Sequence, residues 1–375
     1  MAINFIQYSV GRLSIIGVVS LAMLAGAVAK DPQNIFEPIL DVHEAQENVG
    51  LAAVLRSDGI LADSVYVGAA VVEYDIPVTR ETRFQVMSVT KAFVGAALVK
   101  SVSAGLVDLD VPIQTYLPNY PTPPNGDITL RRLAAHTAGI PHLSHPDRKA
   151  VYVEHYADAR ASLAAFRDLP LVHEPGAAYA YSSAGYTLIA AVLETVHDMS
   201  FPNMLREVVL IPLGLNATGS GDVQAPTSNL ARSYSYIDLW TYQPVDQLLQ
   251  VPTWDFSYNL GGGNLITTAD DLARFGDAFT KPGFFTKEEL DLIGTQIAPE
   301  ISRWGMGWFV NESDSGEKYL SISGATPGVQ AGIVVYPASD TVITALSNAW
   351  GKNSAGGDLV VGAPQRVVEN WRAKN

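Results

Sequence analysis

Ser88 and Lys91 form a Ser-x-x-Lys motif at the start of an apolar stretch that continues with helical spacing through Phe93 and Leu98. On a helix, residues at this spacing lie on the same face, so the Lys91 amine can reach the Ser88 hydroxyl. A serine hydroxyl is a weak nucleophile until a base takes its proton, and a lysine can be that base when burial or a nearby cation keeps part of it neutral. The spacing therefore indicates nucleophilic catalysis by Ser88. A helix N-cap serine followed by a surface lysine is the alternative interpretation.

A second Ser-x-x-Lys match, from Ser315 to Lys318, lies in the polar segment 312–318. The composition of this segment predicts a turn, where neither a helix nor a buried amine is expected. We therefore assign the catalytic role to Ser88 and none to Ser315.

Several other catalytic patterns are missing from the sequence. No serine lies in Gly-x-Ser-x-Gly, the nucleophile elbow of α/β-hydrolases, and neither a His-Glu-x-x-His zinc helix nor a Gly-x-x-x-x-Gly-Lys phosphate loop occurs. The nearest approach to a metal cluster is a set of three histidines and one aspartate: His136, His142, His145 and Asp147. We interpret these as surface or structural residues, because residues 142–146 read as a loop bounded by proline. We therefore expect neither a metal nor an organic cofactor.

The composition describes a globular, acidic chain. Of its 375 residues, 48% are apolar and 17% are charged, which argues against general disorder and a coiled coil. Asp and Glu outnumber Lys and Arg by 38 to 24, a net charge of −14, so neither nucleic acid nor an anionic membrane surface is an expected partner. The absence of cysteine excludes disulfides, thiolate metal sites and a cysteine nucleophile. With Ser88 as nucleophile, the expected partner is a small-molecule ester, amide or peptide substrate.

The first 29 residues read as a secretory signal. Arg12 precedes an apolar run over 13–26, and residues 27–29, Ala-Val-Ala, form a site that signal peptidase could cut. Cleavage would leave a secreted or periplasmic chain that starts at Lys30 and has no stable membrane span. An uncleaved membrane anchor is the alternative, since the apolar run is near the upper length limit for a signal.

Strands are expected at both ends of the chain and helices between them. Two hairpins are predicted, one over 49–72 around an Asp58-Gly59 turn and one over 330–346 around a turn at 337–340. Helical spacing or a helix cap occurs in four segments: 38–47, 88 to about 210, from 267 onward, and 364–373. Residues 211–262 show no clear period.

This order of elements predicts an α/β (α+β) fold, in which a mainly antiparallel sheet built from both ends of the chain is flanked by helices. We expect an α/β sheet domain formed by 31–85 and 260–375, and a mostly helical inserted domain over 86–259. The active site would lie in the cleft where these domains meet.

Several segments, in order, resemble landmarks of the serine β-lactamase-related family, which includes class C β-lactamases, DD-peptidases and β-lactamase-like esterases. They are 84–91, 105–110, 128–133, 135–141, 174–176, 181–183 and 324–328. The resemblance covers about 49–348. Segments 181–186, 261–264 and 305–308 are most similar to the mitochondrial serine β-lactamase-like branch and its bacterial relatives. The fold that this resemblance implies is that of β-lactamases and penicillin-binding proteins.

The resemblance also implies roles for individual residues. Ser88 would be the acylated nucleophile, Lys91 would take its proton, and Tyr181 would pass a proton to the leaving group and activate water. Ser183 falls where the family often has Asn and would bind substrate. The oxyanion hole would be formed by the backbone N–H groups of Ser88 and Ala325.

The third motif departs from the family. The family usually has Lys-Thr-Gly or His-x-Gly, whereas this chain has Ile322-Ser323-Gly324, with Ser323 and Gly324 as expected substrate contacts. Because the missing cation holds substrate carboxylates in the family, an apolar pocket wall at Ile322 and a neutral ester substrate are expected. A β-lactamase or D-alanyl-D-alanine carboxypeptidase is the alternative enzyme. A catalytically weakened binding or scaffold protein of the same fold is the alternative from another class.

Overall fold

The computed structural model describes residues 34–143, 154–241, 243–352 and 358–375. The predicted signal peptide, 1–29, lies outside the described residues and stays a prediction. His145 and Asp147 also lie outside the described residues. The described residues belong to one compact unit, 31–375. The predicted sheet domain and inserted domain are therefore described below as two regions of this unit.

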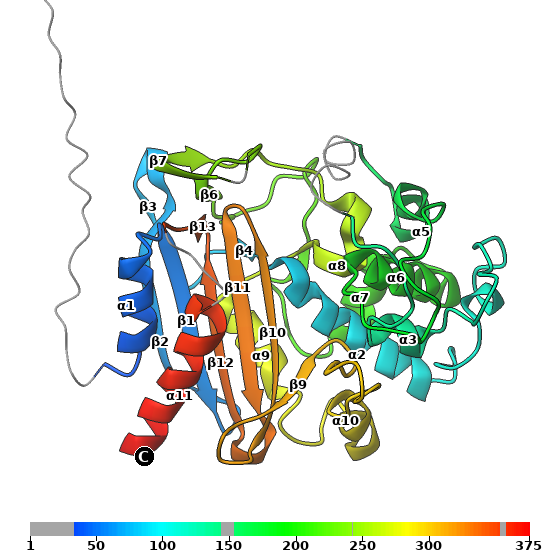
Figure 1. The fold of residues 1–375 in the computed structure, drawn as a ribbon. Coiled ribbons are helices and arrows are strands. Elements are labelled where there is room, and N and C mark those ends of the chain that lie inside the picture. Colours follow the sequence, from blue (N-terminus) through cyan, green and yellow to red (C-terminus); the bar gives the residue numbers. More distant parts are fainter. Residues whose placement is uncertain (1–33, 144–153, 242, 353–357) are drawn as a thin grey trace, which may run out of the picture. The chain divides into compact units, whose positions relative to one another are not determined.

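A seven-stranded sheet combines the two ends of the unit (Figure 1). All its neighbouring strands pair antiparallel. In spatial order the strands are β3 (Ile76–Pro77), β2 (Ile60–Val71), β1 (Gly50–Ser57), β12 (Thr341–Ser347), β11 (Val329–Tyr336), β10 (Lys318–Thr326) and β9 (Phe309–Glu312). The early β1 pairs with the late β12, with Leu51 opposite Ser347. The predicted fold class, an α+β fold with a mainly antiparallel sheet, is confirmed.

Both predicted hairpins form. At the tip of β1 and β2, Asp58 and Gly59 both have positive φ angles, 53° and 77°, which suits a tight hairpin turn. β11 and β12 are joined by a turn that ends at Asp340 with φ 46°. Every residue of β11 and β12 is buried, which explains why their sequences do not alternate between apolar and polar residues.

Helices cover both faces of the sheet. Alternate residues of β1 point into two separate cores, Leu51 and Leu55 into one and Ala52 and Val54 into the other. Helices α1 (Glu37–Ala45) and α11 (Ala363–Lys374) lie side by side over the first core (Figure 1). Helix α9 (Ala269–Asp277) contacts β1, β11 and β12 from the second. The expected helices near both chain ends are confirmed.

The middle of the chain is mainly helical but includes short strands. Among the described residues, its helices of four or more residues are α2 (Thr90–Ser103), α3 (Leu130–Ala134), α5 (Ala159–Ser162), α6 (Ser183–His197), α7 (Phe201–Leu205), the π-helical turn Arg206–Leu210 and α8 (Leu260–Gly263). Helix α10 (Lys287–Ile293) comes after α9 in the chain. The segment without clear period holds β5 (Gly219–Ser220), β6 (Tyr234–Ile237) and β7 (Pro244–Gln250). β5 pairs with β8 (Leu265–Thr267), whereas β6 pairs with both β7 and β13 (Ala349–Trp350). These strands are short and partly exposed, so they carry little of the period that reveals a strand in a sequence.

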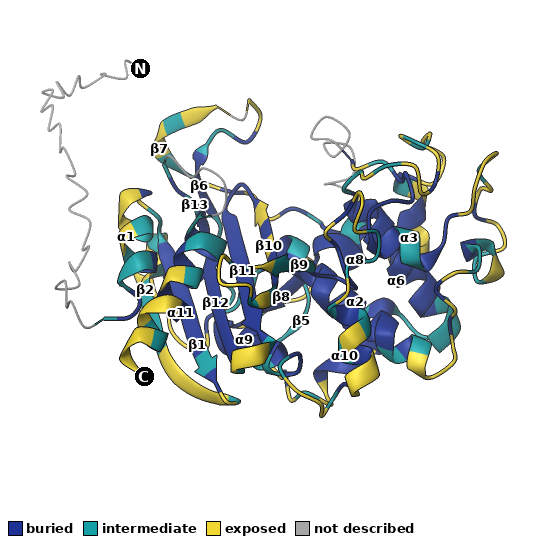
Figure 2. Cartoon of the chain, turned by 60° about the horizontal axis from the view of Figure 1, so that its bottom comes forward, coloured by how far each residue is buried: buried dark blue, intermediate teal, exposed yellow. Residues whose placement is uncertain are grey.

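Helix α2 is buried on almost all sides, as the dark blue of α2 and α6 in Figure 2 shows. It packs against α6, α8 and α10, and its Phe93 stacks on Phe275 of α9 with 3.7 Å between ring centroids. A side chain on the first turn of α2 is therefore removed from water. Within the described ranges, no helix has the length and apolar character that a membrane crossing requires.

Candidate active site

Ser88 lies in a single 3-10 turn, Met87–Val89, that joins strand β4 (Phe84–Gln85) to helix α2. The backbone N–H of Val86 donates to Leu265 O at 3.0 Å, which ties this junction to β8. Met87 has a φ of 43°, a left-handed conformation that costs a non-glycine residue roughly 1–3 kcal/mol. The turn therefore presents Ser88 at the start of α2 in a conformation that the surrounding structure must hold in place.

The structure brings together three of the predicted catalytic residues. The Ser88 hydroxyl is 2.6 Å from the Tyr181 hydroxyl, and the Lys91 ammonium donates to Ser88 Oγ at 3.1 Å. Lys91 Nζ also lies 5.0 Å from the centre of the Tyr181 ring. Ser88 in the turn before α2 and Lys91 in the first turn of α2 thus meet Tyr181, which lies just before α6. Their assignment as nucleophile, base and proton carrier stays a prediction.

Lys91 is fully buried, with 0% exposure. Besides Ser88, it donates to Ser183 Oγ at 3.0 Å and to the backbone oxygen of Gly262 at 2.6 Å. A side chain at Gly262 would lie 2.5 Å from the backbone oxygen of Ser183, so this close approach of α8 to α6 requires glycine. Burial lowers the pKa of Lys91 below its ordinary value of 10.5, although the neighbouring Tyr181 acts in the opposite direction.

The pKa of Tyr181 is also lowered from its ordinary value of 10.0. Burial alone raises this pKa, but the charge of Lys91 and hydrogen bonds with Lys91, Ser88 and Ser183 together outweigh it. Lys91 and Tyr181 therefore form a buried pair in which both groups release a proton more readily than in water. Perturbed groups of this kind cluster at functional sites.

Strand β10 lies against the Ser88 turn and places the third motif. Ser323 and Ala325 line the cavity described below, whereas Gly324 alternates with them and faces the turn. A side chain at Gly324 would lie 2.1 Å from Val86 O and 2.6 Å from Ser88 N, so only glycine lets the two backbones approach this closely. Ser88 N and the β10 backbone are thus neighbours, as the predicted oxyanion hole requires.

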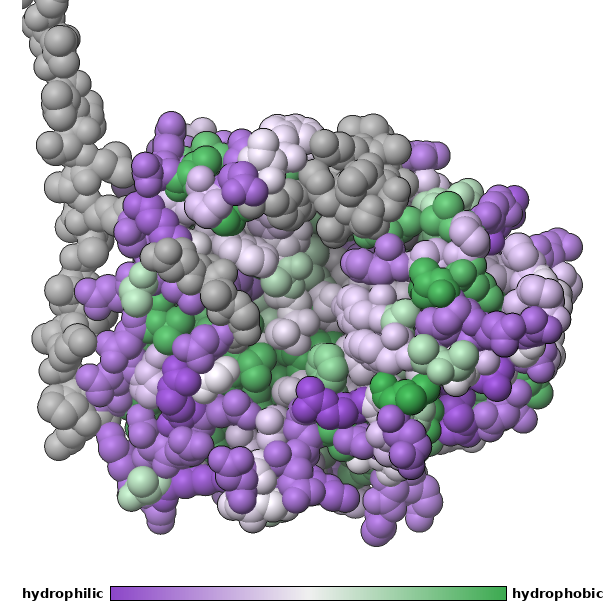
Figure 3. All heavy atoms as spheres, in the orientation of Figure 1, coloured by the Kyte–Doolittle hydropathy of each residue, from purple (hydrophilic) through white to green (hydrophobic). Residues whose placement is uncertain are grey.

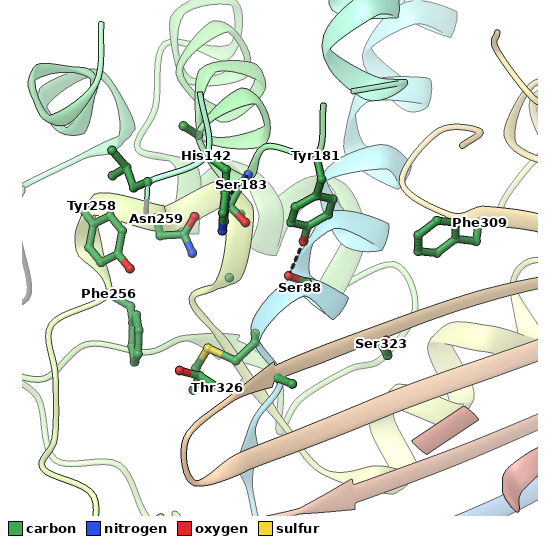
Figure 4. Close-up of a pocket in the computed structure, with 16 residues that line it drawn as sticks. Ser88, His142, Tyr181, Ser183, Phe256, Tyr258, Asn259, Phe309, Ser323 and Thr326 are labelled. Carbon is green, nitrogen blue, oxygen red and sulfur yellow. Dashed lines mark hydrogen bonds between the residues drawn. The ribbon is translucent and has the colours of Figure 1, made fainter. Parts of the chain in front are cut away.

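A cavity of about 310 Å³ opens beside Ser88 (Figure 4). The described residues that line it are Met87, Ser88, His142, Leu143, Tyr181, Ser183, Ala184, Phe256, Tyr258, Asn259, Gly262, Gly263, Phe309, Ser323, Ala325 and Thr326. None of these is Asp, Glu, Lys or Arg. Figure 3 shows a hollow near the middle of one face, with pale and green residues inside and purple residues around much of the periphery. The cavity is therefore suited to a small uncharged molecule.

The sequence model of the family described as Beta-lactamase matches residues 33–361. The chain belongs to the Beta-lactamase family. The Homo sapiens "Serine beta-lactamase-like protein LACTB, mitochondrial" is 24% identical to it over 331 residues, which cover 69% of this chain and 59% of LACTB. The chain thus spans less than two thirds of the length of that relative.

Two solved structures share the fold. D-amino acid amidase from Ochrobactrum anthropi has a TM-score of 0.76 at 21% identity, covering 92% of this chain and 100% of the amidase chain. EstCE1, "a hydrolase with promiscuous acyltransferase activity", has a TM-score of 0.72 at 21% identity, covering 90% of this chain and 98% of its own. The predicted family and fold are confirmed, and the Beta-lactamase family consists generally of serine hydrolases.

The expectation that Ile322 forms an apolar wall of the pocket is wrong. Ile322 is 1% exposed and belongs to the hydrophobic core, and it does not line the cavity. Because side chains alternate along a strand, Ile322 shares the inward face of β10 with Gly324, and Ser323 faces the cavity instead. The cation that the Beta-lactamase family usually has in this motif is thus replaced by core packing.

His136 and His142, the two described histidines that were interpreted as surface or structural residues, contact the backbone before and at the start of α6. His136 Nδ1 accepts from Ser182 N at 3.1 Å, and His142 Nδ1 accepts from Ser183 N at 3.3 Å. Over the described part of the chain, no three His, Cys, Asp or Glu side chains are arranged to hold a metal ion.

Part of the cavity wall was not predicted from the sequence. Phe256, Tyr258 and Asn259 come from the segment without clear period, and Phe309 follows segment 305–308. The similarity of segments 261–264 and 305–308 to the mitochondrial branch was a signal that these regions belong to the site. It could not show that Gly262 contributes a backbone oxygen to Lys91, because a backbone acceptor requires no particular side chain.

Proposed function

We propose that this protein is a serine hydrolase that cleaves small, uncharged carboxylic esters or amides through an acyl-enzyme at Ser88. The observation that carries this proposal is the hydrogen-bonded group of Ser88, Tyr181 and a fully buried Lys91 beside a cavity without charged lining side chains. Membership of the Beta-lactamase family supports the general reaction. An ester is favoured over an anionic peptide or β-lactam for the reason given below.

Acylation begins with transfer of the Ser88 proton to Lys91. A neutral amine has two N–H donors and one lone pair, so Lys91 can donate to Gly262 O and Ser183 Oγ while it accepts the Ser88 hydroxyl. After transfer, the ammonium keeps all three partners as acceptors. The proton therefore moves without leaving any of these buried groups unpaired, while Ser88 Oγ bonds to the substrate carbonyl carbon.

The resulting oxyanion would be stabilised by the backbone N–H groups of Ser88 and Ala325. As the intermediate collapses, Tyr181 donates its phenol proton to the leaving oxygen or nitrogen and recovers a proton from the Lys91 ammonium. The leaving group departs as a neutral alcohol or amine, and Ser88 remains acylated. For deacylation, the same pair takes a proton from water as the water attacks the acyl carbon, and that proton then returns to Ser88 Oγ.

The uncharged lining decides between substrate classes. Burying a substrate carboxylate in a cavity without a cationic partner costs several kcal/mol, of the order of the desolvation penalty for an unpaired polar group. Lys91 does not supply that partner, since it lies among Ser88, Ser183 and Gly262 and does not line the cavity. We therefore expect neutral esters to be better substrates than nitrocefin or D-Ala-D-Ala peptides, each of which carries a carboxylate.

The test is labelling with a fluorophosphonate probe, followed by intact-mass analysis and peptide mapping. We expect one adduct on Ser88, together with turnover of short-chain p-nitrophenyl esters that exceeds turnover of nitrocefin. Faster hydrolysis of nitrocefin or of D-Ala-D-Ala peptides would favour the β-lactamase or carboxypeptidase alternative. Neither labelling nor turnover of any substrate would favour the binding or scaffold protein.

A further inference from the structure

His136 is a buried imidazole beside Tyr181 that has no part in the proton transfers above. It follows helix α3 and is 2% exposed. Its ring centre lies 4.6 Å from that of Tyr181 and 4.3 Å from that of Trp304, and Tyr186 is also close, at 5.1 Å. The imidazole thus forms part of the wall behind the Tyr181 ring.

His136 binds the backbone on both sides of Tyr181. Its own carbonyl oxygen accepts from Ala180 N at 2.9 Å, and its Nδ1 accepts from Ser182 N at 3.1 Å. Ser182 in turn is the N-cap of α6, because its hydroxyl accepts from Gly185 N at 3.0 Å. The two bonds from a single residue therefore fix the short segment that carries Tyr181 onto the end of α6.

The second bond requires a neutral imidazole with its proton on Nε2, because Nδ1 must offer a lone pair to Ser182 N–H. Burial, and then the charge of Lys91, lower the pKa of His136 well below its ordinary value, which keeps the ring neutral. Among the described residues, none offers a hydrogen-bond partner to the buried Nε2 atom. A buried donor of this kind is costly and calls for an explanation, and an aromatic ring of the same size would avoid the cost.

We propose that His136 is a positioning residue for Tyr181: by holding both neighbours of Tyr181, it keeps the phenol in hydrogen-bond contact with Ser88 and close to the charge of Lys91. The Nδ1 acceptor is the part of the ring that this role needs, and the unpartnered Nε2 is the cost of providing it. This inference rests on the proposed function, because Tyr181 must transfer protons for its position to matter.

The titratable groups around Tyr181 decide how the role can be measured. Lys91 faces it from α2, His136 and His142 from the segment after α3, and Tyr179 and Tyr186 from its own part of the chain. Arg303 acts on Tyr179 rather than on Tyr181 directly. Lys91 is therefore the cationic neighbour that lowers the pKa of Tyr181, and moving the phenol away from it must raise that pKa.

Two variants separate the acceptor from the ring. His136→Phe keeps a ring but loses the acceptor, whereas His136→Asn keeps an acceptor and suits the left-handed backbone at this position, where φ is 58°. The control is His43→Phe, because His43 also has a buried and unpartnered Nε2 but lies on α1, which packs against α11. The readouts are kcat, KM and the pH dependence of kcat/KM for a p-nitrophenyl ester, with thermal melting to check the fold.

We expect His136→Phe to lower kcat by about 10- to 100-fold with little change in KM, the usual scale for a group that orients a reacting residue. The alkaline limb of kcat/KM, which reports the protonated Tyr181 phenol, should move to higher pH by about one unit, the lower end of the shift that a neighbouring opposite charge produces. His136→Asn should recover most of kcat and return the limb toward wild type. His43→Phe should change neither quantity.

The outcomes distinguish this inference from the function on which it rests. If the wild type shows no turnover that depends on Ser88, the proposed function fails and the inference with it. If the wild type is active, and His136→Phe lowers kcat without moving the alkaline limb, or behaves like His136→Asn, then His136 serves only for packing and the inference alone is overturned. Should His136→Phe fail to fold, His136→Ala against His136→Asn makes the same comparison, since both remove the ring.

Discussion

The chain contains the same four-residue pattern twice, and the structure gives the two copies opposite surroundings. Ser88 lies in the turn that leads into helix α2, and Lys91 lies in the first turn of that helix with its side chain fully buried. Ser315 and Lys318 lie at the turn between β9 and β10, where both residues are exposed. Ser315 contacts the hydroxyl of Ser313 at 2.9 Å, and the turn is completed by Gly316 with φ 82°.

The difference indicates that the proposed role of Ser88 and Lys91 depends on burial and on distant neighbours, because the spacing is the same in both copies. Removal from water lowers the pKa of the Lys91 ammonium, and Tyr181, far along the chain, places its hydroxyl 2.6 Å from that of Ser88. Lys318 sits at the start of an edge-adjacent strand and pairs by backbone with Glu312. The Lys318 side chain is exposed to water, whereas that of Lys91 is buried.

The strongest test of this comparison is to remove each serine in turn. Ser88→Ala should abolish ester turnover and fluorophosphonate labelling, because the proposal assigns the acyl group to the Ser88 hydroxyl, which contacts both Lys91 and Tyr181. Ser315→Ala should leave both unchanged, since its exposed hydroxyl lies away from the cavity. Initial rates and intact masses of the two purified proteins check this. Full activity in Ser88→Ala would refute the mechanism.

Removing each lysine in turn tests whether the buried lysine is needed for turnover and the exposed one is not. Lys91→Ala should lower kcat by at least ~100-fold, the scale expected when a positioned base is lost. Lys318→Ala should stay near wild type. Steady-state kinetics, with circular dichroism to confirm folding, would decide the matter. A Lys91→Ala enzyme within a few-fold of wild type would mean that Tyr181 alone accepts the Ser88 proton.

Much of the fold could be predicted from the sequence because strong local patterns agree with the tertiary structure. The two hairpins have apolar strands and turn residues with positive φ, and they pair β1 with β12 as expected for a sheet built from both ends. Strands β5, β6 and β7 could not be predicted. They are short or partly exposed, and the pairing of β5 with β8 and of β6 with β13 is long-range, so their sequences carry a weak local pattern.

For the candidate site, side chains at a helix start were predictable and the environment was not. Ser88, Lys91 and Tyr181 came from motifs and meet in the structure. The Gly262 acceptor and the cavity wall of Phe256, Tyr258 and Phe309 depend on how distant segments pack. Ile322 was misplaced because the direction of a side chain depends on strand register, which a motif alone does not fix.

Tyr181→Phe should give a loss that is similar to or smaller than that of Lys91→Ala, because Lys91 still accepts the Ser88 proton. The acid limb of the pH profile should shift in opposite directions in Tyr181→Phe and Lys91→Ala. Tyr181 raises the pKa of Lys91, so its removal should lower that pKa further and move the acid limb to lower pH. In Lys91→Ala, Tyr181 is the remaining base. Burial still raises its pKa and the charge of Lys91 no longer lowers it, so the acid limb of the residual activity should move to higher pH. Profiles of kcat/KM that shift in the same direction would contradict the proposed pairing.

The smallest expected effect concerns the cation that the third motif lacks, and it can be tested by moving a lysine along β10. Lys318 lies on this strand outside the cavity, whereas Ser323 faces into it. Ser323→Lys should raise the ratio of kcat/KM for nitrocefin to that for p-nitrophenyl acetate by about tenfold, the value of one added hydrogen bond to a charged group. Ser323→Met is the control for side-chain length and should not raise the ratio.

Ile322→Lys should instead reduce thermal stability, because it would bury an unpaired charge in the core. If Ile322→Lys were stable and gave the larger ratio, the orientation of β10 toward the cavity would have to be the reverse of the one described above.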